Sequence, residues 1–194
     1  MHLESLRPDA MRAGEAVRDA VGFMRTVERD AVEYTLAKAD ASPVTAADFI
    51  VQALVACRLA RHFPGDPLVA EENSSALGSE TARPICERAS SWLATCCQAS
   101  GSRRKGLGWI DRGGGACSRR FWTLDPVDGT KGLLGGGQYV IALALVIDSS
   151  LEIGILGCPR LIVLMKAFSR STQAARGSSI VRIRPPEAGS ARVG

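Results

Sequence analysis

Apolar side chains recur every three or four residues in two stretches near the start of the chain. In the first stretch, residues 9–36, the apolar positions are Ala13, Ala16, Val17, Ala20, Phe23, Met24 and Val27. In the second they are Phe49, Ala53, Leu54, Cys57 and Ala60. This spacing places apolar side chains on one face of a helix, so the sequence predicts two amphipathic α-helices.

The boundary between these two helices lies in the segment SPVTAAD, residues 42–48. Thr45 is the predicted N-cap of the second helix, and Asp48, three residues later, completes the pattern of a capping box. Pro64 and Gly65 are predicted to end this helix, because both residues commonly follow a helix terminus.

Shorter apolar runs farther along the chain predict strands. The run PLVAEE, residues 67–72, predicts a strand that ends in Glu71 and Glu72, and residues 121–124 predict another short strand. Residues 139–147 and 151–156 are apolar on either side of a turn segment, which predicts a β-hairpin. Residues 73–120 are weakly patterned, with a helix expected at about 82–98 and a loop at 113–115. Helices followed by mostly antiparallel strands predict an α+β fold.

Composition places the chain among globular proteins, with 46% hydrophobic and 23% charged residues in 194. The longest apolar run, residues 140–147, is far too short to span a membrane. The first ten residues lack the apolar core of a secretory signal, so we expect a cytoplasmic protein, with an organelle as the alternative.

The six cysteines contain no C-x-x-C pair and are expected to be reduced thiols. With only His2 and His62, neither a structural zinc site nor histidine-based nucleophilic catalysis is expected.

The net charge of +4 comes from the end of the chain. Residues 162–194 contain six of the 24 basic residues and one of the 20 acidic residues, which leaves 18 basic and 19 acidic residues in 1–161. Because the body is not basic, no nucleic-acid partner is expected. The change in character predicts two parts, a folded domain over 1–161 and an unrelated basic segment over 162–194, disordered from residue 170 onward.

The most informative stretch is FWTLDPVDGTKG, residues 121–132, where Asp125 and Asp128 stand three residues apart. One interpretation is structural, because Asp and Gly are turn residues and Asp caps helices well. A calcium loop of the EF-hand type is a poor alternative, because acids are not at alternate positions and Pro126 would disrupt the loop.

The other interpretation is chemical. Asp40, Glu71 and the Asp125/Asp128 pair are acids at the ends of apolar segments or in loops. Gathered carboxylates repel one another, and Mg²⁺ relieves this because it prefers oxygen ligands, including a carbonyl such as that of Val127. Gly129 and Thr130 are predicted to open a helix whose free N–H groups suit a phosphate. Together these residues indicate metal-assisted attack of water on a phosphate ester.

These motifs resemble the lithium-sensitive, magnesium-dependent phosphatases of the inositol monophosphatase superfamily. The resemblance rests on VAEE followed by WTLDPVDGT and covers about residues 10–161. DASPVTAAD, DGTKG, QYVIALAL and LGCP are similar to the 3′(2′),5′-bisphosphate nucleotidases, and IDRGGG to their plant-type members. The resemblance implies the N-terminal helix and antiparallel-sheet domain of the inositol monophosphatase-like sugar phosphatase fold. It also implies hydrolysis of the 3′-phosphate of adenosine 3′,5′-bisphosphate to AMP and phosphate, with inositol phosphates as alternative substrates.

The resemblance also implies residue roles. Glu71, Asp125, Asp128 and the carbonyl of Val127 would bind Mg²⁺. Asp40 and Thr130 would orient and deprotonate the attacking water, and Gly129 and Thr130 would hold the phosphate. Asp40 has the alternative of a turn residue before Pro43. A surface or supporting position is expected for Glu72.

The sequence also departs from the family pattern. Members continue into a second α/β domain with a W-D motif whose aspartate binds metal, whereas the tryptophans here, Trp92, Trp109 and Trp122, precede Leu, Ile and Thr. We therefore expect a C-terminally truncated chain without that domain, which leaves two functional classes. One is an active phosphatase acting on a small molecule, and the other is a non-catalytic fragment or partner-binding protein. The sequence does not indicate an oligomeric state.

Overall fold

The structure is a computed structural model that describes residues 3–33, 35–37, 43–78, 80, 82–96, 103–161 and 165–168. The helices are α1 (Leu3–Glu33), α2 (Ala46–His62), α3 (Arg83–Cys96), α4 (Arg103–Asp111) and α5 (Thr130–Leu134), with a short 3₁₀ helix, η1 (Ser74–Gly78). The strands are β1 (Thr35–Ala37), β2 (Pro43–Thr45), β3 (Leu68–Ala70), β4 (Arg120–Asp128), β5 (Val140–Ile147), β6 (Ser150–Gly157) and β7 (Met165–Phe168).

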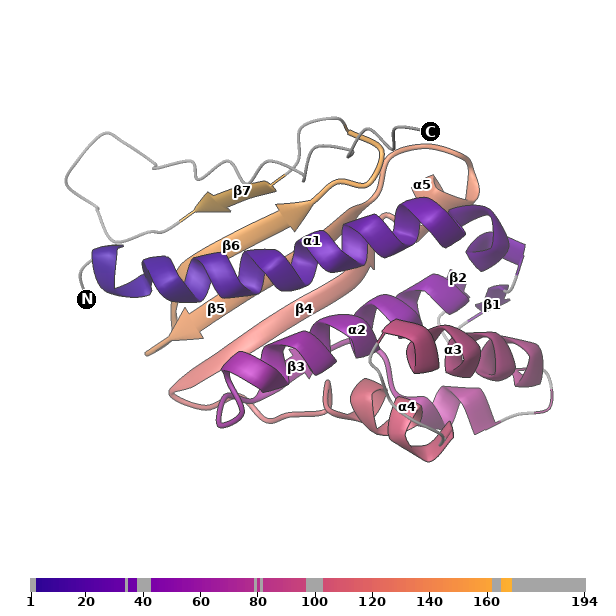
Figure 1. Cartoon of the computed structure of the whole chain (residues 1–194), viewed down its shortest axis with the longest axis horizontal. Coiled ribbons are helices and arrows are strands. Elements are labelled where there is room, and N and C mark those ends of the chain that lie inside the picture. Colours follow the sequence, from indigo (N-terminus) through magenta and orange to yellow (C-terminus); the bar gives the residue numbers. More distant parts are fainter. Residues whose placement is uncertain are drawn as a thin grey trace, which may run out of the picture.

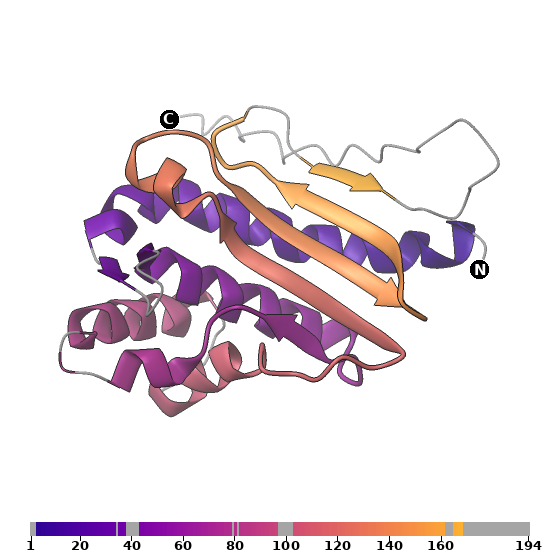
Figure 2. The ribbon, with the colours of Figure 1, turned by 180° about the vertical axis from the view of Figure 1, so that it is seen from behind.

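Two layers make up this part of the chain. Strands β3 to β7 form one sheet in sequence order, with β3 parallel to β4 and the other neighbours antiparallel. Helices α1 and α2 lie side by side across one face of the sheet, and α3 and α4 pack against α2 (Figure 1). Figure 2 shows the opposite face of the sheet, with α1 and α2 behind it. The predicted α+β fold is confirmed.

The hydrophobic core fills the space between the sheet and these helices. Residues on one side of β5, Ile141, Leu143 and Leu145, are at most 1% exposed. Along α2 the buried residues run from Ala46 to Cys57 without a break, because α1, the sheet and the α3–α4 pair enclose this helix. None of the described helices is long and apolar enough to cross a membrane.

The predicted start and end of the second helix are confirmed, whereas the first helix ends at Glu33 rather than at residue 36, and residues 35–37 form strand β1. Thr45 caps α2: its side chain accepts from the Ala47 N–H at 3.1 Å, and its own N–H donates to Asp48 at 2.8 Å. Helix α1 begins at Leu3, six residues before the prediction, with Pro8 inside it. The extra turns form because Leu6 is buried against the core at 3% exposure.

Two elements differ from the prediction. Helix α4 lies within the stretch expected to be irregular, where Gly106 and Gly108 weaken the helical pattern. Strand β4 runs on to Asp128 rather than ending at Leu124. Aspartate and proline disfavour strands, but the register with β5 shifts between Asp125 and Asp128, and this bulge accommodates the extra residue.

The sheet also extends past the predicted domain boundary at residue 161. Strand β7 pairs antiparallel with β6, with Ala167 opposite Ile155. This short strand therefore belongs to the sheet rather than to a separate segment. Residues 169–194 lie outside the described residues, and disorder there stays a prediction.

Close packing of α1 on β6 depends on Gly157. A Cβ atom at this position would lie 2.6 Å from Val17 Cγ1 and 2.7 Å from Val21 Cγ2. We expect Gly157→Ala to lower the free energy of unfolding by about 1–3 kcal/mol, because both valines would have to move. Urea unfolding measures the change. Gly154→Ala is the matched control in the same strand, since nothing lies within 4 Å of its added Cβ. Equal effects of the two substitutions would contradict this account.

Candidate active site

The predicted site residues that the structure describes lie at one end of the β3–β4 pair. Because β3 and β4 are parallel and Ala70 is opposite Leu124, the next residues, Glu71 and Asp125, follow at the same edge. Neighbouring strands are about 4.8 Å apart, so the backbones of these two acids are close. Glu71 is exposed and Asp125 is half-buried. The sheet register thus places the backbones of two acidic residues that are far apart in sequence at the same edge.

The bulge at the end of β4 shapes the rest of the edge. The Val127 N–H donates to Asp125 Oδ1 at 3.2 Å, which folds the aspartate back over its own turn. The Thr130 hydroxyl donates to the Val127 carbonyl at 3.0 Å. Gly129 has a φ of 90°, a conformation that side-chain-bearing residues rarely adopt. The chain therefore reverses sharply between Asp128, which is exposed, and the start of α5.

Asp48 is a candidate site residue that sequence analysis treated only as a helix cap. It is 4% exposed, and its Oδ2 accepts from both the N–H and the hydroxyl of Thr45 at 2.8 Å. Its Oδ1 lies 3.5 Å from the Thr130 hydroxyl, at the limit of a hydrogen bond. Burial raises the pKa of Asp48 to about 6, the nearby Glu72 carboxylate also raises it, and the hydrogen bonds from Thr45 act in the opposite direction. A carboxyl that titrates near neutral pH beside a site threonine is suited to proton transfer.

The second acid of the VAEE segment is held in place by Gln52. This side chain is fully buried; its Oε1 accepts from the Glu72 N–H at 2.9 Å, and its Nε2 donates to the Glu72 and Ile110 carbonyls at 2.6 and 2.8 Å. A Cβ at Gly113 would collide with Gln52 Nε2 and Ala70 Cβ, so glycine is needed beside this amide. One glutamine thus joins α2, the end of β3 and α4.

A family model described as the Inositol monophosphatase family matches residues 5–184. The chain belongs to the inositol monophosphatase family. Within it, the chain is 37% identical over 157 residues to the 3′(2′),5′-bisphosphate nucleotidase of Emericella nidulans, covering 75% of this chain and 45% of that protein. It is 38% identical over 161 residues to the enzyme of that name from Oryza sativa, covering 77% and 45%. The chain spans about half the length or less of the curated relatives that it matches.

Solved structures of this family show the same fold. The IMPase of Thermotoga maritima superposes with a TM-score of 0.57 at 17% identity, covering 90% of this chain and 52% of that one. The inositol monophosphatase of Anabaena gives a TM-score of 0.51 at 20% identity, covering 86% and 46%. At these identities the likeness concerns the fold alone.

One of the predicted site residues, Asp40, lies outside the described residues, so its role stays a prediction. Within the described ranges, no three His, Cys, Asp or Glu side chains are grouped closely enough to hold a metal ion. Glu72 is 5% exposed, so the surface alternative for this residue was wrong.

Replacing Gln52 by leucine is expected to lower the free energy of unfolding by roughly 2–4 kcal/mol. Leucine has a similar size but would leave the Glu72 N–H and the buried carbonyls of Glu72 and Ile110 without this partner. Chemical denaturation measures the loss. Gln138→Leu, at an exposed position, is the control and should change stability by less than about 0.5 kcal/mol. A stable Gln52→Leu protein would show that the amide is not a structural anchor.

Proposed function

We propose that the chain carries the metal-binding half of a Mg²⁺-dependent phosphomonoesterase site. The observation that carries this proposal is the placement of Asp125 and Asp128 on the bulged end of β4, beside Glu71, with Thr130 at the start of α5. The site therefore combines two aspartates of one strand end with a threonine hydroxyl and a glycine turn. Family membership and the names of the curated relatives support the same reaction class.

The donor set fits Mg²⁺ in its chemistry. Glu71, Asp125, Asp128 and the Val127 carbonyl offer only oxygen atoms, which hard cations prefer. Mg²⁺ is usually held by one or two carboxylates while it keeps several waters, so the absence of a closed three-carboxylate group among the described residues does not count against it. When bound, Mg²⁺ would polarise a phosphate oxygen and offset the charge of these carboxylates.

We assign the proton-transfer role to Asp48 together with Thr130. The Thr130 hydroxyl lies between the Val127 carbonyl and Asp48, so it is placed to orient a water molecule toward the site. With its pKa raised to about 6, Asp48 is ionised at pH 7 to 8 and is able to accept a proton from that water. Gly129 and Thr130 would hold the phosphate, as the sequence predicts, and the left-handed conformation of Gly129 reverses the chain just before Thr130. Sequence analysis placed Asp40 in this role.

The substrate that the relatives favour is adenosine 3′,5′-bisphosphate, hydrolysed at its 3′-phosphate to AMP and phosphate. Curated relatives at 36–38% identity carry the name 3′(2′),5′-bisphosphate nucleotidase, which is why this substrate is preferred to inositol phosphates. A relative from Arabidopsis thaliana, 40% identical over 135 residues, carries the name "Putative 3′(2′),5′-bisphosphate nucleotidase, mitochondrial". An organelle therefore stays an alternative to the cytoplasm for this chain.

The deciding experiment measures phosphate release by the purified chain from adenosine 3′,5′-bisphosphate, with inositol 1-phosphate as the competing substrate. We expect release that requires Mg²⁺, decreases with Li⁺ and is faster with the nucleotide. Faster release from inositol 1-phosphate would reassign the substrate. A folded chain that releases no phosphate from either substrate would contradict the enzymatic proposal and favour a non-catalytic fragment.

A further inference from the structure

A cavity rich in arginine lies at the C-terminal half of α1, and none of the candidate active-site residues line it. Arg25, Thr26, Glu28, Arg29 and Arg160 line this open cavity of about 660 Å³, which we call the arginine cavity. Three guanidinium groups and one carboxylate give its lining a net charge of +2. We propose that the arginine cavity binds the phosphate or sulfate group of a small anionic ligand. This inference does not depend on the proposed function.

Arg25 is held in a defined position. Its Nε and Nη2 donate to the carbonyls of Pro159 and Leu161, at 2.9 and 3.0 Å. These bonds join α1 to the segment after β6. A guanidinium has five N–H donors in a fixed fork, so Arg25 keeps donors on Nη1 for a ligand. An arginine that is already ordered loses less conformational entropy when an oxyanion binds.

Arg160 is fixed in the same way and also neutralises the acid in the cavity. It donates to the Gly136 carbonyl and to Glu28 Oε1. The other oxygen of Glu28 accepts from the Tyr139 hydroxyl at 3.4 Å. Because both oxygens of Glu28 accept hydrogen bonds, its negative charge repels a bound anion less strongly than the charge of an unpaired carboxylate would.

Arg29 is the arginine that remains available. It is exposed, and no hydrogen bond or ion pair joins it to another residue whose side chain the structure describes. Two anchored guanidinium groups and one available group around a single cavity suit a tetrahedral oxyanion, which accepts several charge-assisted hydrogen bonds at once. A phosphate or sulfate group fits this arrangement better than a carboxylate, since it offers more oxygens.

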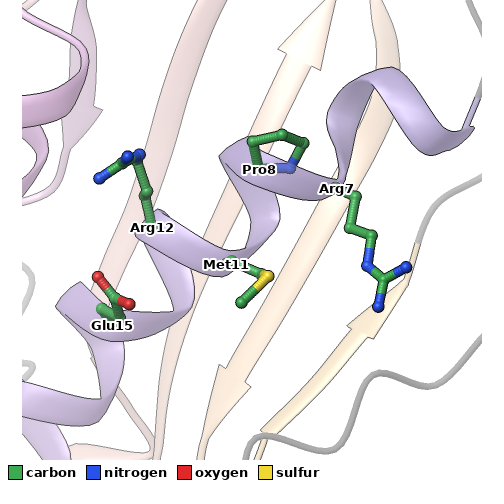
Figure 3. A pocket seen from close by; sticks show the side chains of 5 residues that line it. All are labelled: Arg7, Pro8, Met11, Arg12 and Glu15. Atoms are coloured by element: carbon green, nitrogen blue, oxygen red, sulfur yellow. The ribbon is translucent and has the colours of Figure 1, made fainter.

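A second cavity on α1 lacks these features. It has a volume of about 370 Å³ and is lined by Arg7, Pro8, Met11, Arg12 and Glu15. Figure 3 shows Arg7 and Arg12 pointing to opposite sides of the helix. The guanidinium of Arg12 also lies 3.1 Å from His62 Nδ1. Its arginines do not converge, so this cavity is not proposed as an anion site.

The test is a calorimetric titration of the whole chain with pyrophosphate and, separately, with sulfate, in EDTA. Chelation keeps divalent metal from the candidate active site. We expect wild-type binding that weakens with salt, and an affinity about 10-fold lower in Arg29→Ala, the loss of one charge-assisted contact. Arg61→Ala removes the same charge from an exposed position in α2 and should leave the affinity unchanged.

Three outcomes would overturn the proposal. The first is the absence of binding by the folded chain at anion concentrations of about 10 mM, on the scale of weak binding. The second is an equal loss of affinity in Arg29→Ala and Arg61→Ala. The third is a loss of affinity in Thr130→Val that Arg29→Ala does not share. The last outcome would assign the anion to the candidate active site. Tighter binding of pyrophosphate than of sulfate would assign a phosphate group to the ligand, and the reverse order would assign a sulfate group.

Discussion

Replacing Asp125 by asparagine is expected to lower phosphate release by at least about 100-fold, because substitutions of groups that only support metal ligands already reduce affinity or activity by 10- to 100-fold. The fold should survive. Asparagine keeps a side-chain oxygen that is able to accept from the Val127 N–H, as Asp125 does. What is lost is the negative charge that would hold Mg²⁺.

Metal binding gives this prediction a measurement that does not depend on turnover. A ligand that binds the folded state raises the midpoint of thermal unfolding. We expect Mg²⁺ to raise this midpoint in the wild type but not in Asp125→Asn or Asp128→Asn. Asp148→Asn is the matched control, because Asp148 is an exposed aspartate in the β5–β6 turn that pairs with Arg119. A Mg²⁺ response that persists in Asp125→Asn would show that this carboxylate is not a ligand.

The second large effect is expected at Asp48, where stability and activity should change in opposite directions. Its pKa is raised from 3.8 to about 6, so the folded state binds this proton more tightly than the unfolded state. The stabilisation associated with the protonated form is therefore complete below pH 3.8 and is lost as the pH rises through about 6. Asp48→Asn stays neutral and should be more stable than the wild type by roughly 1–3 kcal/mol at pH 8. Near pH 3.5 the two proteins should differ little.

Phosphate release by Asp48→Asn should nevertheless fall by about 100-fold or more, because asparagine accepts no proton from water. Urea unfolding at several pH values and the release assay at pH 8 measure the two effects on the same protein. Asp19→Asn, at a half-exposed aspartate on α1, is the control and should change neither quantity strongly. An active Asp48→Asn protein would return the catalytic role to Asp40 or to another group.

Hydrophobic periodicity predicted the helices and strands that are determined by their local sequence. Helix α2 follows from its apolar spacing, its capping box and the Pro64-Gly65 pair, all of which are local signals. Strand β4 was predicted too short because Asp125 and Pro126 are typical of turns, and only pairing with β5 keeps them in the sheet. Local patterns therefore predicted where elements begin better than how tertiary pairing extends them.

The site was only partly predictable for the same reason. The DPVDGT motif predicted Asp125, Asp128 and Thr130 as candidate site residues, because their spacing carries the signal. Asp48 was not predicted as a candidate, since its capping role already explained an aspartate at that position. Gln52 gave no signal, because its partners at 72 and 110 are far along the chain. A capping aspartate that is followed by an unbroken buried stretch is the one clue that sequence offers to a second role.

The parallel pairing of β3 with β4 has a consequence for the order of folding. Residues 68–70 must meet residues 122–124, across the whole α3–α4 segment, whereas β5 and β6 are joined by a tight turn. Contacts between residues that are distant in sequence have a larger entropic cost of loop closure, so they form more slowly than local contacts. We therefore expect the β5–β6 hairpin to form first and β3 to join the sheet late. The two sides of the carboxylate edge would then meet only near the end of folding, so a partly folded chain would have no affinity for Mg²⁺.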